Sequence, residues 1–222
     1  MEKTVNTQHQ TLDYEEGYHA KRHNNHAKEA YYDARAKIAI SKFFKHVDKE
    51  SRILDFGCGM GQNMLYLPNA VGYDISEYGL DFCRSKGLTV TNSVDDLEDN
   101  SFDVVFSSHV LEHHPHPKAM LEVMHSKLKS GGILLLVIPF ERHGKSDFEL
   151  DLNQHLYNWN FRNINNLLLT VGFKIQKNKY VRGGGYHKLL PLSKINFPLY
   201  RTLTKVAAYT FGIREMMILA RK

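Results

Sequence analysis

The sequence has little of what secreted or membrane-embedded proteins need. Its only cysteines are Cys58 and Cys83, too few for the disulfide framework that stabilises small secreted domains. The longest apolar run extends only from Ile133 to Phe140, which is too short to span a bilayer. The N-terminal residues are polar and lack the apolar core of a secretory signal. These absences favour a protein of the cytoplasm.

What the chain has in excess is positive charge near its C-terminus. The formal net charge is +5 at pH 7 over 222 residues. Between Arg182 and Lys222, eight cations stand against one acid, Glu215, so this segment carries +7 and the rest of the chain sums to −2. A basic end on a near-neutral body predicts contact with an anionic partner, such as a phosphate, a lipid surface or a nucleic acid.

Short apolar runs alternate with amphipathic stretches over the first two-thirds of the chain. The runs predict strands over residues 52–56, 71–74, 88–91, 102–107, 133–139, 173–181 and 215–220. The amphipathic stretches predict helices over residues 26–47, 77–86, 117–129 and 161–171, and Gly131 with Gly132 predicts a turn. This alternation predicts one α/β domain, a mostly parallel sheet with helices on both faces. Such sheets bind ligands at the carboxyl ends of their strands.

A glycine-rich loop follows the first predicted strand. Asp55 ends that strand, and Gly57, Gly59 and Gly61 occupy every second position after it. Glycines suit a sharp turn against which a ligand lies, and the spacing differs from the dinucleotide-binding fingerprint. An acid in front of the loop suits a ligand with a cationic end, whereas it would repel a pyrophosphate. The acid that ends the next strand, Asp74, is placed to bind the hydroxyls of a ribose.

These motifs resemble those of the class I methyltransferases that use S-adenosylmethionine (SAM). The resemblance covers roughly Ser51 to Val181, and its branch is similar to the ubiquinone-biosynthesis O-methyltransferases and to bacterial small-molecule and sugar methyltransferases. It rests on LDFGCGMG, VGYDIS, SFDVVFSSHVLEH, LKSGGILLLVIP, HLYNWNFRNINNLLLTVGF and MMILARK. It implies a Rossmann-like, seven-stranded sheet whose last strand is antiparallel. It also implies that Asp55 and the glycines hold the methionine end of SAM, that Asp74 holds the ribose, and that Ile75 lies beside the adenine.

The chain departs from the family pattern in two places. The family often has an acid that contacts the adenine amino group, and NSVDDL places Ser93 there, with Val94 beside it. We expect Ser93 and Val94 to contribute to the cofactor site, with Asp95 or Asp96 as substitute acids. The second departure is residues 182–213, which form an insertion between the last two strands, where the family has a short hairpin. Residues 1–47 are expected to form an N-terminal tail and helical lid of a single domain, 1–222.

The segment after the fourth predicted strand, SSHVLEHHPHP, is rich in histidine. The resemblance places His109 near the methyl group that is transferred, and histidine titrates in the range of a general base. His109 is therefore the first candidate catalytic base and His113 the second, while Glu112 is interpreted as structural. HVLEH also matches an inverted zinc-protease motif, but prolines and the preceding strand disfavour a protease. No metal ligands are assigned. A divalent ion stays open, because some relatives carry acids and a histidine here, with His109 replacing an acid.

Two further regions are candidates for contact with an acceptor or a partner. In HLYNW, His155 and Tyr157 are predicted to contact the substrate, and Trp159 is interpreted as a packing residue. In the insertion, one helix side is predicted to carry four apolar and aromatic residues, Tyr200, Leu203, Val206 and Tyr209, with Arg201 and Lys205 beside them. That side is interpreted as a membrane-surface patch, as a lid over a phosphorylated acceptor, or as a plain solvated helix.

The leading hypothesis is O-methylation of a small-molecule acceptor, namely a sugar, a nucleotide-sugar or a lipid-linked intermediate, with SAM as the cofactor. The alternative within the class is N-methylation of a small amine or amino-sugar. Two less favoured hypotheses are a non-catalytic SAM-binding protein and a nicotinamide-dependent oxidoreductase. The Asn-Pro-Pro-Tyr motif of many nucleic-acid and protein amine methyltransferases is absent, and SSHV occupies its place. We therefore expect no nucleic-acid partner, and the basic C-terminal region is a candidate for peripheral membrane contact.

Overall fold

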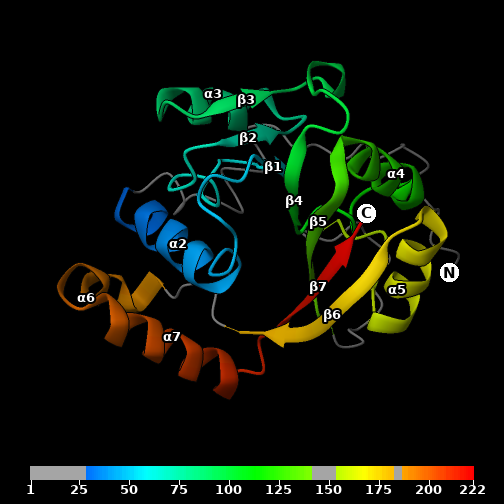
Figure 1. The fold of residues 1–222 in the computed structure, drawn as a ribbon. Coiled ribbons are helices and arrows are strands. Elements are labelled where there is room, and N and C mark those ends of the chain that lie inside the picture. Colours follow the sequence, from blue (N-terminus) through cyan, green and yellow to red (C-terminus); the bar gives the residue numbers. More distant parts are fainter. Residues whose placement is uncertain (1–28, 142–153, 183–186) are drawn as a thin grey trace, which may run out of the picture.

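The computed structural model describes residues 29–141, 154–182 and 187–222 (Figure 1). A single seven-stranded sheet runs through them in the order β3-β2-β1-β4-β5-β7-β6. Its strands are β1 (Ile53–Phe56), β2 (Ala70–Tyr73), β3 (Thr89–Thr91), β4 (Phe102–Ser108), β5 (Leu128–Pro139), β6 (Lys174–Val181) and β7 (Glu215–Arg221). Neighbours from β3 to β5 are parallel, whereas β7 runs antiparallel to both β5 and β6. The predicted fold class is confirmed.

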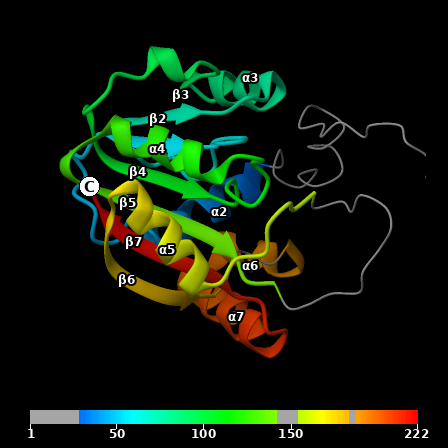
Figure 2. The ribbon, with the colours of Figure 1, turned by 90° about the vertical axis from the view of Figure 1, so that its right-hand side faces the viewer.

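Helices cover both faces of this sheet (Figures 1 and 2). On one face, α4 (Pro117–Lys127) and α5 (Phe161–Val171) bury Leu121, Met124, Ile164 and Leu168 against alternate residues of the strands. On the other face, α2 (Glu29–Lys42) and α3 (Glu77–Ser85) bury a second cluster that includes Cys58 and Cys83. The central strands are buried on both faces, and their sequences are therefore continuously apolar rather than alternating.

The junction between α4 and β5 differs from the sequence prediction. We expected a helix to Lys129 and a turn at Gly131 and Gly132, but the helix ends at Lys127 and the strand begins at once with Leu128. Both glycines lie inside β5, and Gly131 has a φ of 74°. The pairing of β4 with β5 shifts register after Phe102, so the glycines accommodate an irregularity within the strand. The two glycines do mark an unusual backbone conformation, but they lie within a strand and not in the predicted turn.

The region predicted as an insertion contains two helices, α6 (Leu190–Ile195) and α7 (Phe197–Thr210). Tyr200 is fully buried in a small third cluster with Ala34 and Ile38 of α2. The prediction that Tyr200 shares one helix side with Leu203 was wrong, because the buried side of α7 carries Tyr200, Thr204 and Ala208. These residues recur every four positions and pack inward, which leaves Leu203 exposed on a different side.

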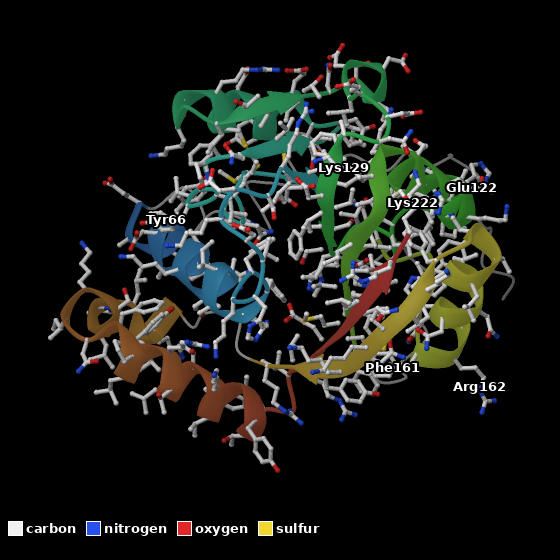
Figure 3. The ribbon with its side chains drawn as sticks, in the orientation of Figure 1. Tyr66, Glu122, Lys129, Phe161, Arg162 and Lys222 are labelled. Atoms are coloured by element: carbon white, nitrogen blue, oxygen red, sulfur yellow. The ribbon has the colours of Figure 1, made fainter. Side chains whose placement is uncertain are left out.

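Hydrogen bonds at two points hold the periphery to the sheet (Figure 3). The hydroxyl of Tyr66, after the glycine loop, donates to the carboxylate of Asp33 on α2. At the opposite end of the strands, Lys222 donates to the carbonyl of Leu128 at 2.8 Å. The first contact fixes α2 next to the glycine loop. That loop lies where the strand order reverses between β1 and β4, the position at which open α/β sheets bind their ligands.

Candidate active site

The loop after β1 is shaped by close backbone contacts. The N–H groups of Gly57 and Cys58 both donate to the carbonyl of Tyr73, at 2.7 and 2.9 Å. Gly57 has a φ of 82°, and a Cβ built on it would lie 2.2 Å from Cγ2 of Val110, in the loop after β4. Gly59 has a φ of 53°, but a Cβ there would meet no atom within 4 Å. The loop therefore packs tightly at Gly57 and faces open space at Gly59.

Asp55 is a buried carboxyl group beneath this loop. Only 1% of the residue is exposed, and neither carboxyl oxygen has a hydrogen-bond partner among the described residues. Burial, with the nearby charge of Asp74 adding to it, raises the pKa of Asp55 to about 8. An unsatisfied buried carboxyl is costly unless a ligand completes it. A cationic group is the ligand that suits it best.

Asp74, at the end of β2, is held by two backbone donors. Its Oδ2 accepts from the N–H of Gly59 at 2.7 Å, and its Oδ1 accepts from the N–H of Ser76 at 3.0 Å. Because both oxygens are fixed, the carboxylate presents its remaining lone pairs in a defined direction. Ile75 follows directly and is 61% exposed, an uncommon state for a side chain of this size beside a buried loop. Asp74 and Ile75 therefore offer a ligand a polar and an apolar contact at neighbouring positions.

The segment predicted to bind adenine forms a short capped turn. Ser93 caps the 3-10 helix η1 (Val94–Asp96), and its Oγ accepts from the N–H of Asp95 at 3.3 Å. The hydroxyl of Thr91 donates to Asp96 at 2.5 Å. Of the two acids considered as substitutes, Asp96 therefore accepts a hydrogen bond from its neighbour Thr91. The hydroxyl oxygen of Ser93 accepts the hydrogen bond that caps η1.

His109 follows β4 in a strained backbone conformation, with a φ of 58°. Its N–H donates to the carbonyl of Val137 at 2.9 Å, which fixes it at the end of the strand. Its Nε2 lies 2.9 Å from Oε1 of Glu215 at the start of β7, and 41% of the side chain is exposed. Partial loss of hydration at the end of β4 would by itself lower the pKa of this half-exposed histidine, but the carboxylates of Glu112 and Glu215 outweigh it and raise the pKa of His109 to about 9. Positive φ at a non-glycine residue is typical of functional positions.

Three imidazole rings converge on Glu112, which is fully buried. Its Oε1 lies 3.5 Å from Nδ1 of His109, 4.0 Å from Nε2 of His113 and 3.9 Å from Nε2 of His155. Neither carboxylate oxygen of Glu112 makes a hydrogen bond with a described residue. The backbone carbonyl of Glu112 accepts from the N–H of Leu156 at 2.8 Å, which brings the segment before α5 to the segment after β4.

The ring nitrogens that point away from Glu112 are held from outside the cluster. Nδ1 of His155 lies 2.7 Å from Oε1 of Glu141, and Nδ1 of His113 lies 3.4 Å from the carbonyl oxygen of Gln154. The two rings stand edge to face, with centroids 4.7 Å apart. One ligand atom each from Glu112, His113 and His155 lie within 4.8 Å of one another, a set that could hold a metal ion.

Comparison with known proteins places this geometry in a family. A model described as a methyltransferase domain matches residues 26–178, more than half of the chain. This chain belongs to the SAM-dependent methyltransferases. A search among curated proteins gives no match.

Solved structures share the fold of this methyltransferase at low sequence identity. The 1,6-didemethyltoxoflavin-N1-methyltransferase of Burkholderia thailandensis, solved with bound 1,6-didemethyltoxoflavin and S-adenosylhomocysteine, is 20% identical with a TM-score of 0.59, covering 93% of this chain and 84% of that one. A phosphoethanolamine N-methyltransferase of Haemonchus contortus is 15% identical with a TM-score of 0.58, covering 92% and 58%. The [4+2]-cyclase SpnF is 19% identical with a TM-score of 0.58, covering 86% and 80%. These similarities establish the fold.

The residues of the methyltransferase cleft fit SAM chemically. The sulfonium and the amino group of SAM carry positive charge, and the unpartnered carboxyl of Asp55 could hold the amino group. The open space at Gly59 leaves room for a ligand against the backbone, and the carboxylate of Asp74 stands at its rim. The predicted cofactor residues thus gather at one edge of the sheet, at the ends of β1 and β2 and in η1.

The predicted catalytic and substrate residues separate into two groups. His109, His113 and His155 come together around Glu112. Tyr157 instead donates from its hydroxyl to the carbonyl of Pro115 at 3.0 Å and stacks on Trp159 with ring centroids 5.4 Å apart. Trp159 is 8% exposed and belongs to the main core, in agreement with its interpretation as a packing residue.

Sequence reasoning missed the acids that position the histidines of this methyltransferase. Glu215 joins His109 to Lys42 of α2, and Glu141 holds His155. Burial acts to raise the pKa of Glu215, but His109 and Lys42 lower it well below its usual range. One signal was available: Glu215 is the sole acid in a segment that carries +7. An isolated acid in such a segment indicates a specific partner.

Proposed function

We propose that this methyltransferase transfers the methyl group of SAM to an oxygen atom of a small-molecule acceptor. Sugars, nucleotide-sugars and lipid-linked intermediates are the classes to screen. The observation that carries the proposal is the cluster of three imidazole rings around the buried Glu112, at the carboxyl end of β4 and next to the cofactor loop. The contact of Gly57 with Val110 joins that loop to the segment that bears the cluster.

The cofactor assignments belong to the same proposal. We infer that Asp55 and the glycine loop hold the methionine end of SAM, and that Asp74 binds the ribose hydroxyls. Ile75, exposed next to Asp74, suits one face of the adenine, with Ser93 and Val94 at its edge. Support comes from the unsatisfied carboxyl of Asp55 and from the fixed orientation of Asp74.

An oxygen acceptor explains why basic groups gather at this position. Methyl transfer is an in-line displacement, so positioning of the nucleophile supplies most of the rate enhancement. A hydroxyl is a weak nucleophile until its proton is removed, and an imidazole in hydrogen-bond reach does this. His113 faces the buried carboxylate of Glu112, which would stabilise the imidazolium that forms, and burial lowers the pKa of His113, so its ring is neutral and free to accept the proton. His109, with a pKa of about 9, is already protonated at neutral pH and would act as a charged partner of the acceptor rather than as the base. A neutral amine acceptor has a free lone pair and needs no such base.

The cluster also suits a divalent metal ion, which would serve the same acceptor. Glu112, His113 and His155 offer a carboxylate and two imidazole nitrogens, and the outward nitrogens of both rings are held by Glu141 and the Gln154 carbonyl. Metal-bound histidines characteristically have such outer partners, which fix the ring orientation. A bound cation would lower the pKa of a coordinated hydroxyl.

The test is an acceptor screen that follows the release of S-adenosylhomocysteine, first with the native chain and then with variants. His113→Gln and His155→Gln should lower turnover on an oxygen acceptor by roughly 100-fold or more. The matched control is His116→Gln, an exposed histidine in the same segment, which should turn over normally. Affinity for SAM should be unchanged in all three variants, because none of them lies in the glycine loop.

The outcomes separate the alternatives. Near-normal turnover by both His113→Gln and His155→Gln would contradict the proposal and favour an amine acceptor. Chelation with EDTA distinguishes the two oxygen mechanisms. Activity lost on chelation and restored by Zn²⁺ or Mg²⁺ assigns the metal, whereas activity that is indifferent to EDTA but sensitive to His113→Gln assigns a histidine base.

A further inference from the structure

The outward side of α6 and α7 exposes many apolar side chains. Of the fourteen large hydrophobic residues that are exposed in the described part of the chain, seven lie between residues 195 and 213. We call them the apolar stripe: Ile195, Leu199, Leu203, Val206, Tyr209, Phe211 and Ile213. Figure 1 shows α6 and α7 outside α2 and at the end of β6, with no other labelled element beyond them. Exposed apolar patches of this extent mark contact sites.

Positive charge borders the apolar stripe. Residues 182–214 contain six cations and no acid. Around α7, the buried side carries Tyr200 and Thr204, the apolar stripe lies on the far side, and Arg201 and Lys205 project between them, because successive residues rotate by about 100°. The helix therefore presents an apolar side with a cationic edge.

That cationic edge lines a cavity of about 240 Å³ between α2, β6 and α7. Five cations and no acids contribute to its walls, namely Lys42, Lys179, Arg182, Arg201 and Lys205. Lys42 is paired with Glu215, whereas the other four form no ion pair with a described residue. The guanidinium of Arg182 lies 4.8 Å from the ring centre of Tyr209, so the cavity adjoins the apolar stripe. A cavity of this size whose described lining is cationic and contains no acid suits a phosphate group.

We propose that the apolar stripe and this cavity together dock the methyltransferase on an anionic phospholipid membrane. The stripe would lie at the boundary between headgroups and acyl chains, and the cavity would receive a lipid phosphate. Apolar burial and attraction to anionic lipids are the two contributions that hold amphipathic helices at membranes. The inference goes beyond the proposed function, because it does not depend on which atom of the acceptor is methylated.

Charge and side-chain type favour a membrane over other occupants. A second copy of the chain, paired through the same surface, would bring cations against cations. Nucleic acid would match the charge, but bases stack on aromatic rings and leave aliphatic residues such as Ile195, Leu203 and Val206 in water. Residues 1–28 carry four cations and four acids, so they offer no net negative charge. Of these occupants, an anionic lipid surface is the one that matches both the cations and the aliphatic side chains.

Docking in this way would bring the reaction site close to the lipid. Lys42 lines the cavity and also binds Glu215, which in turn holds His109. One side chain, that of Lys42, thus separates the proposed phosphate position from Glu215, the acid that holds His109. If the proposed function holds, an acceptor anchored in the membrane would be reached without leaving it.

The test is co-sedimentation of the full chain with vesicles of phosphatidylcholine, with or without phosphatidylglycerol. The native chain should bind only the anionic vesicles, and less so at high salt. The Arg201→Gln/Lys205→Gln variant should bind on the order of 10- to 30-fold more weakly, since each cation near an anionic leaflet contributes roughly a five-fold factor. The Leu203→Ser/Val206→Ser variant should also lose binding while keeping every charge. Lys174→Gln/Lys177→Gln, which removes two exposed cations from β6, is the matched control and should bind normally.

Four results would overturn the proposal. The native chain could fail to bind anionic vesicles at low salt, or the control pair could lose as much binding as Arg201→Gln/Lys205→Gln. Soluble glycerol phosphate could displace the chain from vesicles, which would indicate a site for free phosphate. A native dimer that Leu203→Ser/Val206→Ser dissociates would assign the surface to a second copy. Unchanged affinity for S-adenosylhomocysteine in every variant verifies that the fold is intact.

Discussion

At the scale of single residues, the buried carboxyl of Asp55 dominates the electrostatics beneath the glycine loop, which is the proposed cofactor site. The pKa of an aspartate in an unfolded chain is about 3.9, and burial beneath the glycine loop raises the pKa of Asp55 to about 8. Between these two values the folded chain holds a proton that the unfolded chain has lost. Asp55 therefore contributes stability to the ligand-free protein that is lost as the pH rises from about 4 to about 8.

Asp55→Asn should remove this dependence. The amide has the shape of the carboxylic acid but cannot ionise, so the ligand-free variant should be more stable than the native protein near pH 8 and closer to it near pH 5. Denaturant unfolding at a series of pH values measures the difference. The same variant should bind SAM more weakly, because a neutral amide is a poor partner for an ammonium group. Parallel stability curves for the two proteins from pH 5 to 8 would show that Asp55 does not titrate in this range.

The residues that sequence could and could not predict differ in how they are brought together. Asp55 lies one residue before the end of β1 and Asp74 directly follows β2, and the local pattern of apolar run and acid predicted this edge of the sheet for both. Glu215 and Lys42 lie 173 positions apart, and only the antiparallel insertion of β7 beside β5 brings them to His109. No periodicity in the sequence encodes that approach. Glu112 was interpreted as structural, and the structure buries it among three histidines, a position that its spacing in the sequence did not reveal.

At the scale of elements, the strand-loop-helix units were predictable, whereas their junctions and orientations were not. The helix that ends at Gly172 has an asparagine cap and a left-handed glycine, signals that sequence carries directly. The direct passage from α4 into β5, without a loop, depends on the pairing of β5 with β4, and the sequence around the junction does not indicate it. The rotation of α7 about its axis depends on Tyr200 filling a gap beside α2. The predictions of the junction and of the orientation of α7 were both wrong because tertiary packing determines each of them, while the local sequence is compatible with more than one arrangement.

The contact between the glycine loop and the loop after β4 leads to a prediction for Gly57→Ala. The new methyl group would lie 2.2 Å from Cγ2 of Val110, at a φ of 82°. Left-handed strain and overpacking together should destabilise the protein by roughly 2–4 kcal/mol. Gly87→Ala, with a φ of 73° and open space around the added atom, is the matched control and should cost only the left-handed strain, about 1–2 kcal/mol.

Urea unfolding measures both variants of this pair. Gly57→Ala combined with Val110→Ala should recover part of the loss, because the second substitution removes the atom that clashes. Equal destabilisation by Gly57→Ala and Gly87→Ala would mean that the glycine loop moves aside freely. That result would contradict a tight contact between the glycine loop and the histidine segment.

At the scale of the whole molecule, the strand order explains why the candidate site has two halves. The order reverses between the paired strands β1 and β4, so the loops that follow them leave the same edge of the sheet, and they approach closely at Gly57 and Val110. The antiparallel β7 starts at the same edge and contributes Glu215, while α6 and α7 extend the molecule beside α2. Among the described helices, none has the length and apolar content needed to cross a membrane.

The most direct measurement is isothermal titration of the chain with S-adenosylhomocysteine, SAM and NAD. The account predicts binding of the first two, no binding of NAD, and affinity about 10- to 100-fold weaker in Asp74→Ala, as expected for lost hydrogen bonds to a charged group. Asp81→Ala, an exposed aspartate on α3, is the matched control and should bind as the native chain does. Native affinity for S-adenosylhomocysteine in a folded Asp74→Ala protein, or preference for NAD, would contradict the assignment of the cleft.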